Sequence, residues 1–143
     1  MGGYRDWGFE LIRRTSTDLP ADVDGRIRAA REREDEGSTA RNVLDAILAN
    51  VELARTEGTP ICQDTGLASF FLHLPRGMDA EPVKAELTEA IRQATREGLL
   101  RPNAVDPVTG RNSGDNVGPG QPYFSVEVHD SSDVVIELLL KGG

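Results

Sequence analysis

One short apolar run, residues 68–74, lies between two longer segments whose apolar residues recur at helical spacing. The first helical segment, residues 38–58, opens with a serine suited to an N-cap and closes with a glycine. The second, residues 81–98, carries proline in its first turn, where the missing N–H costs little. A buried strand between two amphipathic helices excludes an all-helical chain and predicts a mixed architecture.

Both helical segments present an apolar face. The face of the first consists of Ala40, Val43, Leu44, Ile47, Leu48, Val51 and Ala54. The face of the second, which we expect to be buried, consists of Val83, Leu87, Ala90, Ile91 and Ala94. Nearer the N-terminus, residues 4–14 predict a short helix, and residues 21–36 predict a solvated helix in which acidic and basic side chains alternate.

Two more strands are predicted near the C-terminus, at residues 123–128 and 134–140, with a polar turn at 130–133 between them. Their spacing predicts that they pair as a hairpin. The fold class is therefore α+β, with N-terminal helices packed on a small mixed or antiparallel sheet and a C-terminal hairpin. At 143 residues, the chain has the length of a single domain.

The composition excludes some partners. A net charge of −8 argues against nucleic acid, since non-specific binding to nucleic acid requires a positive surface. No apolar run approaches the roughly 20 residues that a membrane span needs. The N-terminus lacks a basic stretch followed by an apolar core, so the sequence predicts no signal peptide and a cytoplasmic protein.

The single cysteine, Cys62, excludes an internal disulfide. It begins a run of four reactive or polar residues, 62–65, that ends at Gly66. Such a run between a helix and a strand makes a poor core and suits a loop that presents groups to a ligand. Cys62 could be a nucleophile, a metal ligand or an inert thiol.

A nucleophilic cysteine needs a base, and the chain offers only His73 and His129. The pattern puts one in a strand and the other at a turn, which favours structural or solvated roles for both. A metal would need more ligands than one thiolate, because zinc takes about four and clusters take three or four. The chain also ends directly after an apolar strand, so we expect the functional unit, and its other ligands, to continue elsewhere.

A long loop rich in glycine, proline and asparagine, residues 99–122, is the second candidate for a site. Arg101 and Arg111 could bind a carboxylate by paired hydrogen bonds, while glycines let backbone N–H groups approach an anion. The alternative is a solvent-facing cluster of turns in which these residue types only satisfy turn geometry.

Four segments together resemble the N-terminal region of the iron–sulfur class I fumarate hydratases and the related L-tartrate dehydratase alpha subunits. They are residues 60–66 (PICQDTG), 100–107 (LRPNAVDP), 111–116 (RNSGDN) and 141–143 (KGG). The resemblance extends from about Ser38 to the end. Residues 117–120 depart from the shorter form expected at this place in the family.

The resemblance implies a hydro-lyase that converts fumarate to (S)-malate with a 4Fe-4S cluster held by three cysteines. Cys62 matches one cluster ligand, and the others would come from missing or partner sequence, the C-terminal portion or a beta subunit. Gln63, Asp64, Arg101 and Gly143 match residues that contact the dicarboxylate, with Asp64 also handling a proton. Arg111 and Asn116 are weaker matches, kept as loop or supporting residues. Apart from the resemblance, the abrupt end after an apolar strand leads us to expect an oligomer.

Three alternatives remain open from the sequence. The substrate could be tartrate or another hydroxy-dicarboxylate, since the groups that would discriminate one hydroxyl are mostly outside this chain. The chain could instead be a cluster-free module for protein interaction or dimerisation, retained for its helical face. A hydrolase with a Cys62 nucleophile is the third alternative and requires one of the two histidines beside the thiol.

Overall fold

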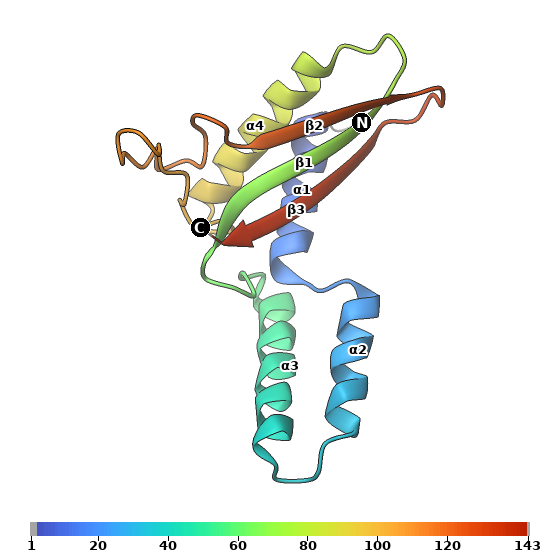
Figure 1. Cartoon of the computed structure of the whole chain (residues 1–143), viewed down its shortest axis with the longest axis vertical. Helices are drawn as coiled ribbons and strands as arrows, with labels where there is room; N and C mark the ends of the chain where they lie inside the picture. The colour runs from blue at the N-terminus through green and yellow to red at the C-terminus, as the bar shows by residue number, and fades with distance from the viewer. Residues whose placement is uncertain (1–2, 143) are drawn as a thin grey trace. The chain divides into compact units, whose positions relative to one another are not determined.

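The computed structural model describes residues 3–142, and the chain divides into two compact units. One unit contains the chain up to Ser16 and again from Cys62 onward, and the other is Thr17–Ile61. Figure 1 labels the helices and strands of both. No helix within residues 3–142 has both the length and the apolar content that crossing a membrane requires.

A mixed sheet of three strands forms one layer of the first unit (Figure 1). The central strand β1 (Thr65–Pro75) pairs in parallel with β2 (Tyr123–His129) and antiparallel with β3 (Val135–Gly142). The sheet order is therefore β2-β1-β3. The helix α4 (Ala80–Arg96) provides the crossover that a parallel β1–β2 connection needs.

The predicted C-terminal hairpin is wrong. β2 and β3 follow one another across a short turn, but each forms its ladder with β1 and not with the other. β1 is the longest strand, and every second residue of it is buried. Its central place in the sheet pairs its backbone groups on both edges. Strand positions were predictable from local pattern, whereas the partner of each strand was not.

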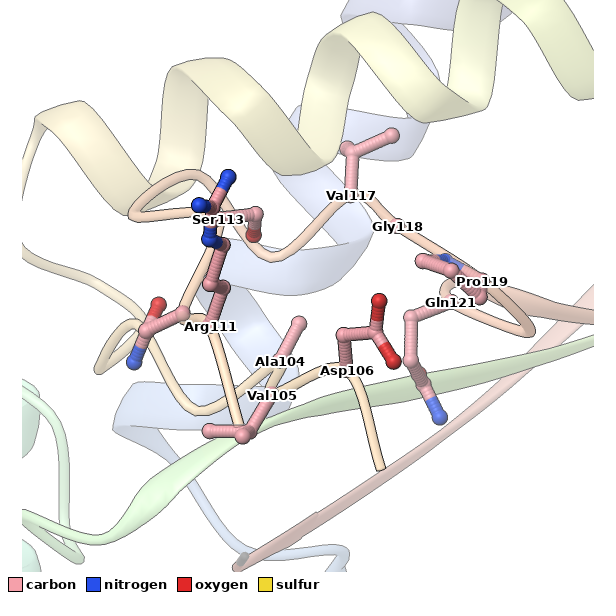
Figure 2. A pocket seen from close by; sticks show the side chains of 10 residues that line it. Ala104, Val105, Asp106, Arg111, Ser113, Val117, Gly118, Pro119 and Gln121 are labelled. Atoms are coloured by element: carbon pink, nitrogen blue, oxygen red, sulfur yellow. The ribbon is translucent and has the colours of Figure 1, made fainter. Parts of the chain in front are cut away.

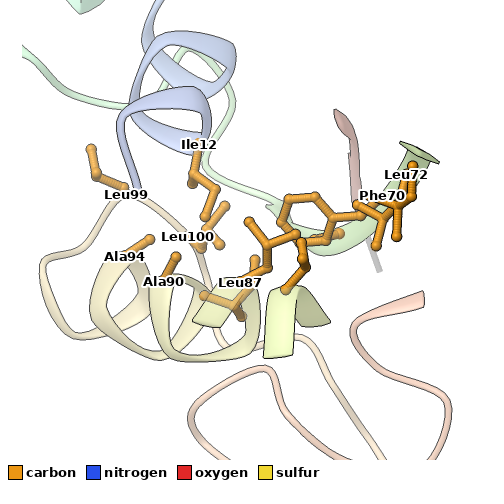
Figure 3. Close-up of a cluster of buried hydrophobic side chains, with 12 residues drawn as sticks. Ile12, Phe70, Leu72, Leu87, Ala90, Ala94, Leu99 and Leu100 are labelled. Carbon is orange, nitrogen blue, oxygen red and sulfur yellow. The ribbon is translucent and has the colours of Figure 1, made fainter. Parts of the chain in front are cut away.

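One face of the sheet is packed and the other is open. Alternate residues of β1 point into a core that α4 and Ile12 of α1 (Tyr4–Thr17) complete (Figure 3). Phe70 stacks on Phe124 of β2 at 5.4 Å between ring centroids. The five residues of α4 predicted to be buried are buried, which confirms the helical face read from the sequence.

The second unit is a pair of helices, α2 (Ala21–Glu32) and α3 (Thr39–Glu57). Ser38 caps α3 by accepting a hydrogen bond from the Arg41 backbone, and Gly58 ends it in a left-handed conformation, both as predicted. Only Val51 and Ala54 of the apolar face of α3 are buried. Val43 and Ile47 from the same face are 53% and 40% exposed.

The α+β class is confirmed by these elements. The expected packing of N-terminal helices on the sheet holds for α1, which contributes Ile12 to the core. The helices α2 and α3 belong to the other unit. Within that unit, α2 has no buried residue and α3 has only two.

Candidate functional site

The cysteine loop leads directly into the sheet. Cys62 is exposed, and its carbonyl accepts a hydrogen bond of 3.3 Å from the Thr65 backbone N–H, which forms a turn just before β1. Gln63, which follows, is also exposed. The turn therefore presents both side chains at the N-terminal end of β1, as the polar run 62–65 predicted.

Asp64, the next residue, forms an ion pair with Arg101. The Arg101 Nη1 donates to Asp64 Oδ1 at 2.9 Å, and the side chains are 60% and 50% exposed, respectively. The backbone carbonyl of Asp64 accepts a further hydrogen bond of 2.5 Å from the Asn103 side-chain amide. Two predicted site residues 37 positions apart in sequence are thus brought together.

Close backbone contacts fix this arrangement. The Arg101 N–H donates to the Thr65 carbonyl at 2.8 Å. Gly66 lies against the Arg101 carbonyl, and a Cβ at position 66 would be only 2.0 Å from that oxygen. A glycine is required here because of this approach, and not because of its backbone angles.

The end of β3 reaches the same place. Thr65 pairs with Gly142, and a Cβ on Gly142 would lie 2.7 Å from Asp64 Oδ2. Asp64, Arg101 and Gly142 therefore gather at one end of the sheet from three separate segments. Gly143, predicted to contact substrate, lies outside the described residues.

Neither histidine is near the thiol. His73 lies eight positions along β1 from Thr65, a distance of roughly 26 Å at about 3.3 Å per residue. There its Nδ1 lies 3.4 Å from Glu127 Oε2, and its Nε2 lies 3.6 Å from Glu137 Oε2. His129 pairs with Pro75 at that same far end. A nucleophilic pair of Cys62 with a histidine of this chain is excluded by this geometry.

A metal site within this chain alone is also absent from the described part. Residues 3–142 contain no group of three His, Cys, Asp or Glu side chains arranged to hold a metal ion. Cys62 is a free, exposed thiol that could serve as one ligand among others. The donor set fits one position of an iron–sulfur cluster and is too small to hold a cluster.

The long loop forms a separate pocket of about 300 Å³ (Figure 2). Arg111 and Ser113 lie on one side of it, and Asp106 and Gln121 lie on the opposite side. Hydrogen bonds from the Val108 and Thr109 backbone hold the pKa of Asp106 below its usual value. None of the residues that gather around Asp64 lines this pocket. The two arginines predicted to bind carboxylates therefore lie at different sites, Arg101 beside Asp64 and Arg111 at the pocket.

Two members of the site, Asn103 and Gly142, lie in segments 100–107 and 141–143 that carry the family resemblance, but the sequence predicted no role for either. Asn103 holds the Asp64 carbonyl, and Gly142 packs beside its carboxylate. Neither contact follows from local pattern, because each joins residues far apart in the chain. The sequence placed Gly66 only at the end of the polar run, and its contact with Arg101 required the fold.

The sequence pattern of one protein family, fumarate hydratase (fumerase), matches residues 8–143. A relative from Geobacillus stearothermophilus, whose name assigns it to the class I fumarate hydratases, is 44% identical over 135 residues. That alignment covers 94% of this chain and 26% of the relative.

Two other relatives carry a different substrate in their names. A protein of Methanocaldococcus jannaschii assigned by name as L(+)-tartrate dehydratase subunit alpha is 34% identical, over 91% of this chain and 46% of its own length. The L(+)-tartrate dehydratase subunit alpha of Escherichia coli K12 is 30% identical, over 90% of this chain and 43% of its own length. The chain thus spans between a quarter and a half of the length of these relatives.

Proposed function

Because the chain belongs to the fumarate hydratase (fumerase) family, we propose that it is part of a cytoplasmic iron–sulfur hydro-lyase that interconverts fumarate and (S)-malate. The observation that carries the proposal is the Asp64–Arg101 pair beside the exposed Cys62. It combines a carboxylate-binding cation, a proton-transfer group and a thiolate ligand at one end of a sheet. Residues 1–143 would be the N-terminal part of the alpha region.

Cys62 would contribute one thiolate to a 4Fe-4S cluster. When bound, the cluster would supply a Lewis acid that polarises the substrate hydroxyl and carboxylate. The remaining ligands would come from the C-terminal portion of the polypeptide or from a beta subunit, in keeping with the greater length of the relatives and with the subunit names of two of them.

Arg101 would bind a carboxylate of the substrate. Its guanidinium is already oriented by one carboxylate, that of Asp64, and the pair is exposed. Exposed ion pairs contribute only about 0–1 kcal/mol, so Arg101 can bind a substrate carboxylate beside that of Asp64 at little cost. Gln63 and the backbone at Gly143 would complete the contacts with the dicarboxylate.

Asp64 would transfer the proton. Its Oδ1 accepts from Arg101, which leaves Oδ2 beside Gly142 as the atom that exchanges a proton with the substrate carbon. The absence of a side chain on Gly142 gives a ligand room to approach this oxygen. The pairing with Arg101 keeps the carboxyl group oriented for that role.

Two alternatives have specific support. L-tartrate dehydration is favoured by the names of two relatives, although their identity is lower than that of the fumarate hydratase relative. A cluster-free interaction module is favoured by exposed side chains on the apolar face of α3, such as Val43 and Ile47.

The test is anaerobic reconstitution of the chain with the remainder of its alpha and beta polypeptide, followed by assays with malate and with L-tartrate. We expect Cys62→Ser to abolish cluster absorption and turnover. Arg101→Lys should lower kcat/KM by roughly 100-fold, because lysine cannot form paired hydrogen bonds to a carboxylate.

Arg111→Lys is the matched control, because Arg111 is an arginine of the same loop that lines the separate pocket. It should leave kcat/KM within about threefold of wild type, as surface substitutions usually do. Equal turnover by wild type and Cys62→Ser would overturn the cluster-ligand assignment. Activity with tartrate and none with malate would select the alternative substrate.

A further inference from the structure

Asn116 is a buried amide at the centre of the long loop. It is 2% exposed and has a φ of 61°, the left-handed region that asparagine tolerates better than most residues. All the hydrogen-bonding capacity of a buried amide needs a partner, and Asn116 finds four. These four bonds are unusual in that three of them go to one short stretch of backbone, residues 101–104.

The contacts lie on both sides of the amide. Its Oδ1 accepts from the backbone N–H of Asn103 at 2.7 Å and of Ala104 at 3.1 Å. Its Nδ2 donates to the Arg101 carbonyl at 2.8 Å. The backbone of 101–104 belongs to no helix or strand, so the Asn116 side chain takes the place that a ladder partner would occupy.

The fourth bond anchors the loop to a helix. Asn116 Nδ2 also donates to Thr95 Oγ1 at 3.1 Å, and that hydroxyl donates to the Ile91 carbonyl within α4. The neighbouring Asp115 forms an ion pair with Arg92 at 3.1 Å. Asn116 therefore joins the backbone around Arg101 to the best-packed helix of the first unit.

Arg101 is then held from two directions. Asn116 fixes its carbonyl, and β1 fixes its N–H through Thr65 while Gly66 packs against the same carbonyl. A residue whose peptide groups are held on both sides presents its side chain from a fixed Cα. A shift of that Cα by about 1 Å would move the guanidinium away from a bound carboxylate.

We propose that Asn116 is a positioning residue for Arg101, and that it sets the affinity of the site for the substrate carboxylate from 15 positions away in the sequence. This inference rests on the proposed function in assigning a carboxylate ligand to Arg101. Asn116 itself does not contact the ligand in this proposal; it acts only through the backbone.

The test compares amide hydrogen exchange in the full chain, by NMR, for wild type, Asn116→Ala and Asn116→Asp. In Asn116→Ala, exchange at the Arg101 N–H should accelerate by about tenfold, although Asn116 makes no bond to that N–H. Asn116→Asp keeps the acceptor for Asn103 and Ala104 and loses the donor to Arg101. In Asn116→Asp, exchange at the Asn103 and Ala104 N–H groups should stay within about threefold of wild type. Exchange at the Arg101 N–H should accelerate.

Asn112→Ala is the matched control, since Asn112 donates to the adjacent Pro102 carbonyl from an exposed position of the same loop. It should leave exchange at Arg101 within about threefold of wild type. An unchanged Arg101 rate in both Asn116 variants would overturn the proposal, as would an equal acceleration in Asn112→Ala. Unchanged exchange at the β1 amides verifies that each variant is folded.

Kinetics of the reconstituted enzyme provide the second readout. Both Asn116 variants should raise KM for malate by about tenfold and change kcat by less than about threefold, since carboxylate binding weakens while the reacting groups remain. A fall in kcat alone would contradict a positioning role. If wild type neither binds nor converts a dicarboxylate, the proposed function fails, while the exchange data still decide whether Asn116 holds Arg101.

Discussion

Gly66 shows at the scale of one residue how the site depends on close approach. The strand that carries Phe70 begins where the backbone of Arg101 crosses it, and the crossing leaves no room for a Cβ. The same contact brings the Arg101 guanidinium to Asp64. The close approach of Gly66 to the Arg101 backbone therefore matters both for packing and for the candidate site. A methyl group at position 66 should disturb both.

We predict that Gly66→Ala lowers the free energy of unfolding by about 3 kcal/mol, because the Cβ would meet a backbone oxygen that has no other place to go. Urea unfolding followed by circular dichroism measures the change. Gly118→Ala is the control, since a Cβ there meets nothing within 4 Å. Its effect should stay within about 0.5 kcal/mol, and similar losses in both variants would contradict the steric explanation.

Glu10 provides a prediction about pH. Hydrogen bonds from Arg13 and Arg14 lower the pKa of Glu10 from 4.5 to about 2 in the folded chain. Because the folded-state pKa is depressed, the stabilisation is complete above pH 4.5 and is lost as the pH falls toward about 2. The side chain is 42% exposed, so solvent screening limits the effect.

Glu10→Gln should therefore lower the free energy of unfolding at pH 7 by roughly 0.5 kcal/mol, with the difference from wild type vanishing near pH 2. Denaturant titrations at a series of pH values measure it. A difference in the free energy of unfolding between wild type and Glu10→Gln that grows as the pH falls would contradict a depressed pKa of Glu10 in the folded chain.

At the scale of elements, both boundaries of α3 are set by local rules. Ser38 accepts from the Arg41 N–H at 3.1 Å and so satisfies one of the free donors at the start of α3. Gly58 accommodates a φ of 66° at its end. Because α3 buries only two side chains, we expect its stability to depend strongly on these ends.

Ser38→Ala should lower the free energy of unfolding of the α2–α3 unit by about 1 kcal/mol, since alanine cannot replace the capping oxygen. Hydrogen exchange of the α3 amides measures this effect directly. Thr39→Ala, one position later and exposed, is the control and should have little effect. Faster exchange in Thr39→Ala than in Ser38→Ala would exclude the capping explanation.

At the scale of the whole molecule, one exposed thiol is too few to hold a cluster. We predict that the 143-residue chain, treated anaerobically with iron and sulfide and then gel-filtered, retains no stable 4Fe-4S cluster and dehydrates no malate. Iron analysis and visible absorption measure the first outcome. Stoichiometric iron that survives filtration in wild type and is lost in Cys62→Ser would contradict the prediction.

Local pattern was sufficient to predict α4, both ends of α3 and the positions of the three strands found within residues 3–142. The five buried residues of α4 follow from helical periodicity, since burial of one face needs only a repeat of 3.6 residues. The cysteine run was recognised as a loop because polar residues such as Asp64 cannot form a core. Nothing local distinguished the pair Asp64–Arg101 from two solvated charges, and resemblance to a family supplied that suggestion.

What the sequence determined by itself was thus the set of helices and strands and the loop that carries Cys62. The tertiary structure decided the partner of each strand, the pairing of Asp64 with Arg101, and the enclosure of Asn116. The physical reason is common to all three, because hydrogen bonds and ion pairs between distant residues depend on which surfaces the core brings together. The largely exposed apolar face of α3 has the same explanation. A repeat of apolar residues shows which side chains can be buried, and only the tertiary structure decides whether another element covers them.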